Sequence, residues 1–182
     1  LIVGEAQLNG TGSIDFARDI PFASLDLKAE PLDFNIFLPE VETGVDAASE
    51  KGSVFRWSEE PLSFAILETL DGVVTIEASS VLMRAYELSQ AKVRIASRGV
   101  NLAIEEFEGQ MFGGTISLTS VLEASNTPTL AANVELVQAS IEDASQVAAG
   151  IEPLSGTMSF QASIQGSGLT QKALVGSPVS YT

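Results

Sequence analysis

Apolar and polar residues alternate with a period of two along much of the chain, the pattern of β-strands with one apolar face. The longest example covers residues 99–122, where Leu102 and Ile104 alternate with polar residues in the first half, and Ile116 and Leu118 do so in the second. Three glycines lie between its two halves: Gly109, Gly113 and Gly114. Glycines inside such a pattern mark a turn, a bulge or a tight bend. We therefore predict a β-hairpin with a glycine corner.

The same alternation predicts strands elsewhere, over residues 13–16, 24–28, 74–78, 91–95, 130–136 and 157–165. Leu88 and Ala91 have opposite parities, and a bulge near Ser89–Gln90 would place both on one face. One longer helix is predicted over residues 140–150. Its start, Ser140 followed by Asp143, resembles a capping box.

Strands joined by short turns favour antiparallel pairing, and a sheet must cover its apolar face. The predicted helices are too few and short to cover it, which leaves a closed barrel, a sandwich or a curved sheet with an apolar groove. The interrupting helices count against an up-and-down barrel. A faint repeat of strand, proline turn, strand and short helix starts at Gly12 and again at Gly114. We predict a mainly β fold, a curved antiparallel sheet forming an open apolar groove of repeating type, with a few short helices.

The composition restricts the chemistry. Cysteine and histidine are both absent, which removes disulfides, thiolate chemistry and the commonest general base and metal ligand. The 182 residues include 24 acidic and 9 basic side chains, a net charge of −15, so nucleic acid is not an expected partner. Hydrophobic residues make up 45% of the chain, which fits a folded domain rather than a disordered acidic one.

Candidate sites are few. Glu105, Glu106 and Glu108 lie beside the glycine corner, and we interpret them as a solvated turn rather than a metal or acid–base cluster. The pairs Gly10-x-Gly12 and Gly166-x-Gly168 lack the third glycine of a dinucleotide fingerprint. We therefore name no catalytic residue, metal or cofactor, and expect a protein that is not an enzyme.

Several segments together resemble the C-terminal region of the AsmA family, whose relatives include TamB. The segments that carry the resemblance are Trp57 to Leu67, Gly99 to Leu102, Met111 to Leu118, Leu154 to Phe160 and Gly166 to Gly176. On this basis residues 54–182 are an AsmA-like β-groove unit, truncated or altered at its end. Residues 1–42 are the end of a preceding unit, and the acidic stretch 43–53 is a linker or boundary.

The resemblance implies a location and a role. Members of the family are typically anchored in the inner membrane of Gram-negative bacteria, with the remainder in the periplasm. They form long sheets with an apolar interior and are implicated in outer-membrane biogenesis and in phospholipid movement between the two membranes. No apolar run of this chain approaches the roughly 20 residues that span a bilayer. We therefore expect a periplasmic piece of a membrane-anchored parent.

Phospholipid acyl chains are the expected ligand of the groove. Its predicted lining is Val74, Ile76, Val93, Ile95, Leu102, Ile104, Ile116, Leu118, Val134, Leu136, Met158, Phe160 and Ile164. These residues could instead form an ordinary core. The alternative function is a structural scaffold of the cell envelope that binds partner proteins through the edges of its sheet.

Overall fold

The computed structural model describes residues 2–3, 6–33, 64, 67, 69, 71–83, 86–149, 155–170 and 173. Most of the residues within these ranges belong to β-strands. The strands are β1 (Ile2–Val3), β2 (Ala6–Asp15), β3 (Phe22–Ala29), β4 (Leu32–Asp33), β5 (Asp71–Met83), β6 (Tyr86–Arg98), β7 (Asn101–Met111), β8 (Gly114–Glu123), β9 (Thr129–Ser140) and β10 (Thr157–Ser167). One helix, α1 (Ile141–Ala149), joins the last two strands.

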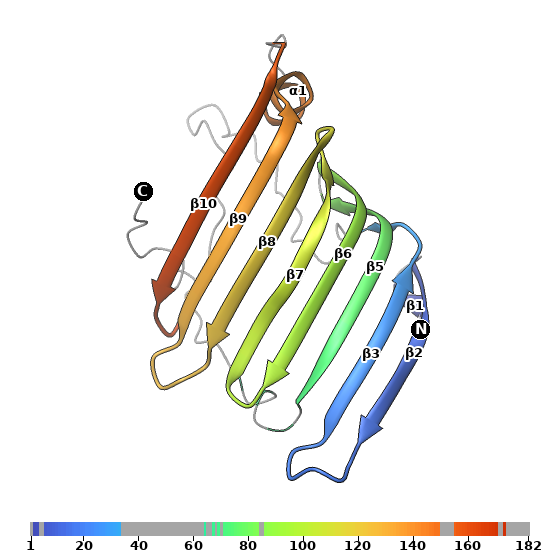
Figure 1. The fold of residues 1–182 in the computed structure, drawn as a ribbon, viewed down its shortest axis with the longest axis vertical. Helices are drawn as coiled ribbons and strands as arrows, with labels where there is room; N and C mark the ends of the chain where they lie inside the picture. The colour runs from blue at the N-terminus through green and yellow to red at the C-terminus, as the bar shows by residue number, and fades with distance from the viewer. Residues whose placement is uncertain are drawn as a thin grey trace, which may run out of the picture.

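All ten strands form one sheet, in the order β1-β2-β3-β5-β6-β7-β8-β9-β10, with β4 also paired to β5 (Figure 1). Every neighbouring pair along this order is antiparallel except β3 and β5, which run in parallel. In the described part of the chain no pairing joins β1 or β2 to β10, so the sheet is open. The prediction of a mainly β, curved and open sheet is confirmed.

The linker predicted over residues 43–53 lies outside the described residues. The strands on either side of it, β3 and β5, pair directly along eight residues, from Phe22 with Asp71 to Ala29 with Ala78. The sheet is therefore continuous between the two predicted units.

The central hairpin consists of β7 and β8, joined by Phe112 and Gly113. Both residues have positive φ angles, 52° and 71°, as a type I′ turn requires. The ring of Phe112 packs edge-on against Tyr86, with 6.2 Å between centroids. Only Gly113 of the three glycines occupies a central position of the turn.

The other two glycines of the hairpin allow close packing, which corrects the expectation of a single glycine corner. A Cβ atom on Gly109 would lie 2.7 Å from Cδ1 of Leu88, and one on Gly114 would lie 2.7 Å from Cα of Ala139. Real Cβ atoms do not approach other atoms so closely. A side chain at Gly114 would collide with backbone atoms of β9, and one at Gly109 would require the Leu88 side chain to move, while Gly113 has no atom within 4 Å of its Cβ position.

The predicted bulge in β6 is confirmed. Gln90 has a φ of 52° in the middle of the strand, and the pairing of β6 with β7 shifts register between Ser89 and Lys92. As a result Leu88 and Ala91, despite their opposite parities, belong to the same buried cluster.

The predicted start of the helix is also confirmed. The Ser140 hydroxyl accepts a hydrogen bond of 3.1 Å from the backbone N–H of Asp143, which satisfies one of the free donors of the first turn. Two acidic residues, Glu142 and Asp143, lie in that first turn, where the helix dipole favours negative charge.

Candidate functional site

The first candidate site is one face of the sheet, which we call the apolar face. Residues paired across neighbouring strands lie side by side and point to the same face. On β5, β6 and β7, Val74 pairs with Ile95, and Ile95 pairs with Ile104. The next row pairs Ile76 with Val93. Apolar residues therefore continue without interruption across these three strands.

The same face continues over β8, β9 and β10. Leu118 pairs with Val134, while Ile116 pairs with Leu136, which in turn pairs with Phe160. The structure brings together on this face all thirteen residues predicted as the lining: Val74, Ile76, Val93, Ile95, Leu102, Ile104, Ile116, Leu118, Val134, Leu136, Met158, Phe160 and Ile164.

These side chains are not enclosed as a core would be. Leu136 is buried, Phe160 is 52% exposed, and the other eleven are half-buried. Six of the ten buried hydrophobic residues in the described ranges are alanines, and no large side chain there falls below 2% exposure. The apolar face is therefore a surface of large, partly exposed side chains.

Five further residues belong to the apolar face although the sequence analysis left them out of the lining: Leu25, Leu27, Phe107, Leu122 and Leu130. Leu25 and Leu27 follow simple alternation and could have been included. Phe107 could not be placed by alternation from Ile104, because β7 contains a bulge between them. Two consecutive glutamates before an apolar residue were the signal of that bulge.

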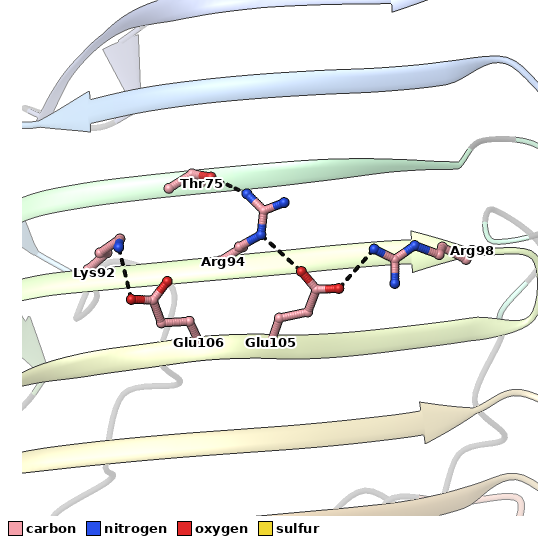
Figure 2. Close-up of polar contacts among 6 residues, drawn as sticks. All are labelled: Thr75, Lys92, Arg94, Arg98, Glu105 and Glu106. Carbon is pink, nitrogen blue, oxygen red and sulfur yellow. Dashed lines mark hydrogen bonds and ion pairs between the residues drawn. The ribbon is translucent and has the colours of Figure 1, made fainter.

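The bulge creates the second candidate site, on the opposite, polar face. The pairing of β6 with β7 shifts register between Arg94 and Ile95, and that of β7 with β8 shifts between Ile104 and Glu108. Glu105 and Glu106 consequently both face the basic residues of β6 (Figure 2). These glutamates lie within a strand, so their interpretation as part of a solvated turn was wrong.

The contacts form a short network of ion pairs. Lys92 Nζ donates to Glu106 at 2.8 Å, and Glu105 accepts from both Arg94 and Arg98 at 2.9 Å. Arg94 also reaches the Thr75 hydroxyl on β5, at 3.4 Å. The network therefore links three adjacent strands across the polar face at the position of the bulge. Its acidic and basic groups satisfy one another, which suits a structural role more than ligand binding.

The network shifts the pKa values of Glu105 and Lys92. Hydrogen bonds from Arg94 and then Arg98 hold the pKa of Glu105 below its usual range, and the hydrogen bond to Glu106 raises the pKa of Lys92. The ion pairs of Glu105 therefore stabilise the fold fully at pH values above the pKa of a glutamate in the unfolded chain. This stabilisation is lost as the pH falls through the lowered pKa of Glu105 in the folded protein. The contribution of Lys92 is present below the ordinary lysine value and is lost only as the pH rises through its raised pKa.

The network can be tested by titration. With Arg94→Gln and Arg98→Gln combined, we expect the pKa of Glu105 to return toward its ordinary value, because both hydrogen-bond donors to its charged form are lost. NMR titration of the side-chain carboxyl carbon measures this. The control is Lys28→Gln, which removes the separate pair with Glu77 (3.6 Å) and should leave Glu105 unchanged. An unaltered pKa in the double variant would mean that the pairs do not form in solution.

Other kinds of site find no support in the described part of the chain. No group of three or more acidic residues there is placed to hold a metal ion. Among the same residues, no helix has both the length and the apolar character needed to cross a membrane.

Comparison with known proteins gives one match. The model of the AsmA family matches residues 1–179, nearly the whole chain. No curated protein and no solved structure matched it.

Proposed function

The chain belongs to the AsmA family, and from this premise we propose that it is a non-enzymatic module whose apolar face binds phospholipid acyl chains. Membership supports a role in the biogenesis of the Gram-negative cell envelope at the level of the family. The finer proposal is that the module lies in the periplasm, as part of a protein anchored in the inner membrane. There it shields lipid tails as they move between the two membranes.

The observation that carries the proposal is the open apolar face. Large apolar side chains cover one face from β5 to β10 and remain half-buried rather than enclosed. Contiguous apolar surface that stays partly exposed to solvent is typical of binding surfaces. Acyl chains would bind by hydrophobic contact alone, and each CH₂ group removed from water stabilises the complex by about 0.8 kcal/mol. Such binding needs no catalytic group.

The dimensions of the face suit an acyl chain. Neighbouring strands lie about 4.8 Å apart, so the six strands from β5 to β10 extend over roughly 24 Å. One leaflet of a bilayer has a hydrocarbon thickness of about 15 Å, half of the full core. A lipid tail laid across the strands would therefore fit within the apolar face. The described part of the polar face carries ion pairs and hydroxyl side chains, with scattered exposed apolar residues such as Val121 and Val137.

Photo-crosslinking tests the proposal. A photoreactive residue at Leu118, in the middle of the apolar face, should trap phospholipid when the protein is mixed with phospholipid vesicles, and mass spectrometry would identify the adduct. Thr119 is the matched control, because it lies next to Leu118 on β8 but points to the polar face. We expect about ten-fold less lipid adduct at Thr119.

Two outcomes would contradict lipid binding. Equal labelling at Leu118 and Thr119 would mean that lipid contacts the protein without regard to face. No lipid adduct at either position would favour the second candidate function, a scaffold that binds envelope proteins through the edges of its sheet. The observation behind that alternative is that β10 ends the sheet with no further strand paired to it in the described residues.

A further inference from the structure

A hydroxyl group lies in the middle of the apolar face. Ser120 belongs to the interior strand β8, and its register partners on the neighbouring strands are Ile104 of β7 and Ala132 of β9. Since paired residues point to the same face, the Ser120 side chain lies among the large apolar residues described above. Ser120 is half-buried, as are both of its partners. It is therefore a polar group within the surface that would receive acyl chains.

Ser120 and Ala132 form a pair of small side chains on this face. Two pairs of large side chains flank it on the same two strands: Leu118 with Val134 and Leu122 with Leu130. Leucine and valine side chains extend farther from the sheet than those of serine and alanine. The small pair therefore leaves room for part of a ligand between the two large pairs, with the Ser120 hydroxyl beneath it.

The Ser120 hydroxyl has no hydrogen-bond partner in the described part of the protein. By contrast, Ser97, which lies opposite Leu102 on the same face, already has an interaction partner. No buried side-chain oxygen among the described residues lacks a hydrogen bond, so the Ser120 oxygen must be open to water. Its O–H donor and its lone pairs are thus available to a ligand.

An acyl chain that covered Ser120 would displace this water. The hydroxyl would then be left unpaired in an apolar environment, which costs free energy. The cost is avoided where the ligand itself places a hydrogen-bond acceptor at this point. In a diacyl phospholipid the acceptors nearest to the apolar tails are the carbonyl oxygens of the two ester bonds. The chemistry at Ser120 therefore fits the ester region of the lipid.

We propose that the Ser120 hydroxyl donates a hydrogen bond to an ester carbonyl oxygen of a bound diacyl phospholipid. This inference rests on the proposed function, because it fixes the position of the lipid on the same apolar face. It assigns to one side chain the recognition of the junction between the polar and apolar parts of the lipid.

An acyl chain that begins at Ser120 has enough apolar surface to cover. The cross-strand pairs continue from Ser120 through Ile104, Ile95, Val74 and Leu25, all of them large and apolar. At about 4.8 Å for each strand, this row extends over roughly 19 Å. That is more than the hydrocarbon thickness of one leaflet, about 15 Å. The tail would therefore stay on the apolar face over its whole length.

Competition between ester and ether lipids tests the proposal. A dialkyl ether phospholipid with the same headgroup and chain length lacks the carbonyl oxygens. The purified chain is offered an equimolar mixture of diacyl phosphatidylethanolamine and its dialkyl ether analogue in detergent micelles, and native mass spectrometry measures the ratio of the two bound lipids. We expect a preference of roughly five-fold for the ester lipid, the effect of one neutral hydrogen bond.

Two substitutions separate the hydroxyl of Ser120 from its small size. Ser120→Ala keeps a small side chain without the hydroxyl, so the preference for the ester lipid should disappear. Ser120→Thr keeps the hydroxyl and suits a β-strand, so the preference should remain. The matched control is Ser117→Ala, on the polar face of the same strand opposite Glu135, which should leave the preference unchanged.

The outcomes distinguish this inference from the proposed function. Bound lipid with no preference for the ester form in the unmodified chain would overturn the role of Ser120 and leave lipid binding intact. A preference that persists in Ser120→Ala would also overturn it, because the carbonyl would then contact another residue. If neither lipid binds to the unmodified chain, both the inference and the proposed function are wrong.

Discussion

Replacing Leu88 with alanine should lower the free energy of unfolding by about 2–5 kcal/mol, the range for a buried leucine that leaves a cavity. Leu88 is 7% exposed and lies in a buried cluster whose other members, Ala29, Ala78 and Ala91, are all small. It therefore supplies most of the apolar volume of that cluster. Urea unfolding followed by circular dichroism measures the change. The exposed neighbour Glu87 is the control, since Glu87→Ala should alter stability by no more than about 0.5 kcal/mol.

The contact between Leu88 and Gly109 makes this prediction sharper. In the unmodified chain Gly109→Ala should destabilise by about 1–3 kcal/mol, because its methyl group would overlap the Leu88 side chain. In the Leu88→Ala background the same methyl group enters the space vacated by the leucine, so its cost should largely disappear. A double-mutant cycle measures the coupling. If the two effects simply add, the two residues do not pack as described.

Replacing Gly114 with valine should have an effect of similar size, about 3 kcal/mol or more, at the upper end of the range for overpacked sites. The atoms that its Cβ would meet are backbone atoms of Val137 and Ala139, including the Ala139 nitrogen at 2.5 Å. Backbone in a paired strand cannot rotate away as a flexible side chain can, so β9 itself would have to move. Thermal or urea unfolding provides the measurement.

The neighbouring turn glycine is the control for Gly114. Gly113→Ala meets no atom within 4 Å and suffers only from its φ of 71°, which costs roughly 1–2 kcal/mol for a residue with a side chain. We therefore expect the buried glycine to be the more sensitive of the two. A greater loss of stability at Gly113 than at Gly114 would refute the close approach of β8 and β9.

The sequence by itself determined which residues share a face. Alternation assigned Ile76, Leu118 and Phe160 to apolar sides of their strands, because the period of side-chain direction is a local property of extended backbone. The parity change between Leu88 and Ala91 predicted the bulge at Gln90 for the same reason. The sequence also predicted the helix cap at Ser140, because the hydroxyl of a capping residue bonds a backbone N–H only three residues away.

Tertiary structure decided everything that depends on which segments meet. The local sequence does not predict that β3 and β5 pair in parallel. It also does not predict that the backbone of Ala139 lies too close to Gly114 for a side chain there. The sequence Glu105-Glu106-Phe107 is compatible with a bulge, but the bulge is established by the register shifts that β7 makes against β6 and β8. Whether the sheet closes or stays open likewise depends on contact between its two ends, β2 and β10, which are separated by most of the chain. The periodicity of a strand fixes its faces, but long-range pairing fixes its neighbours, and the pairing of the described strands leaves the sheet open.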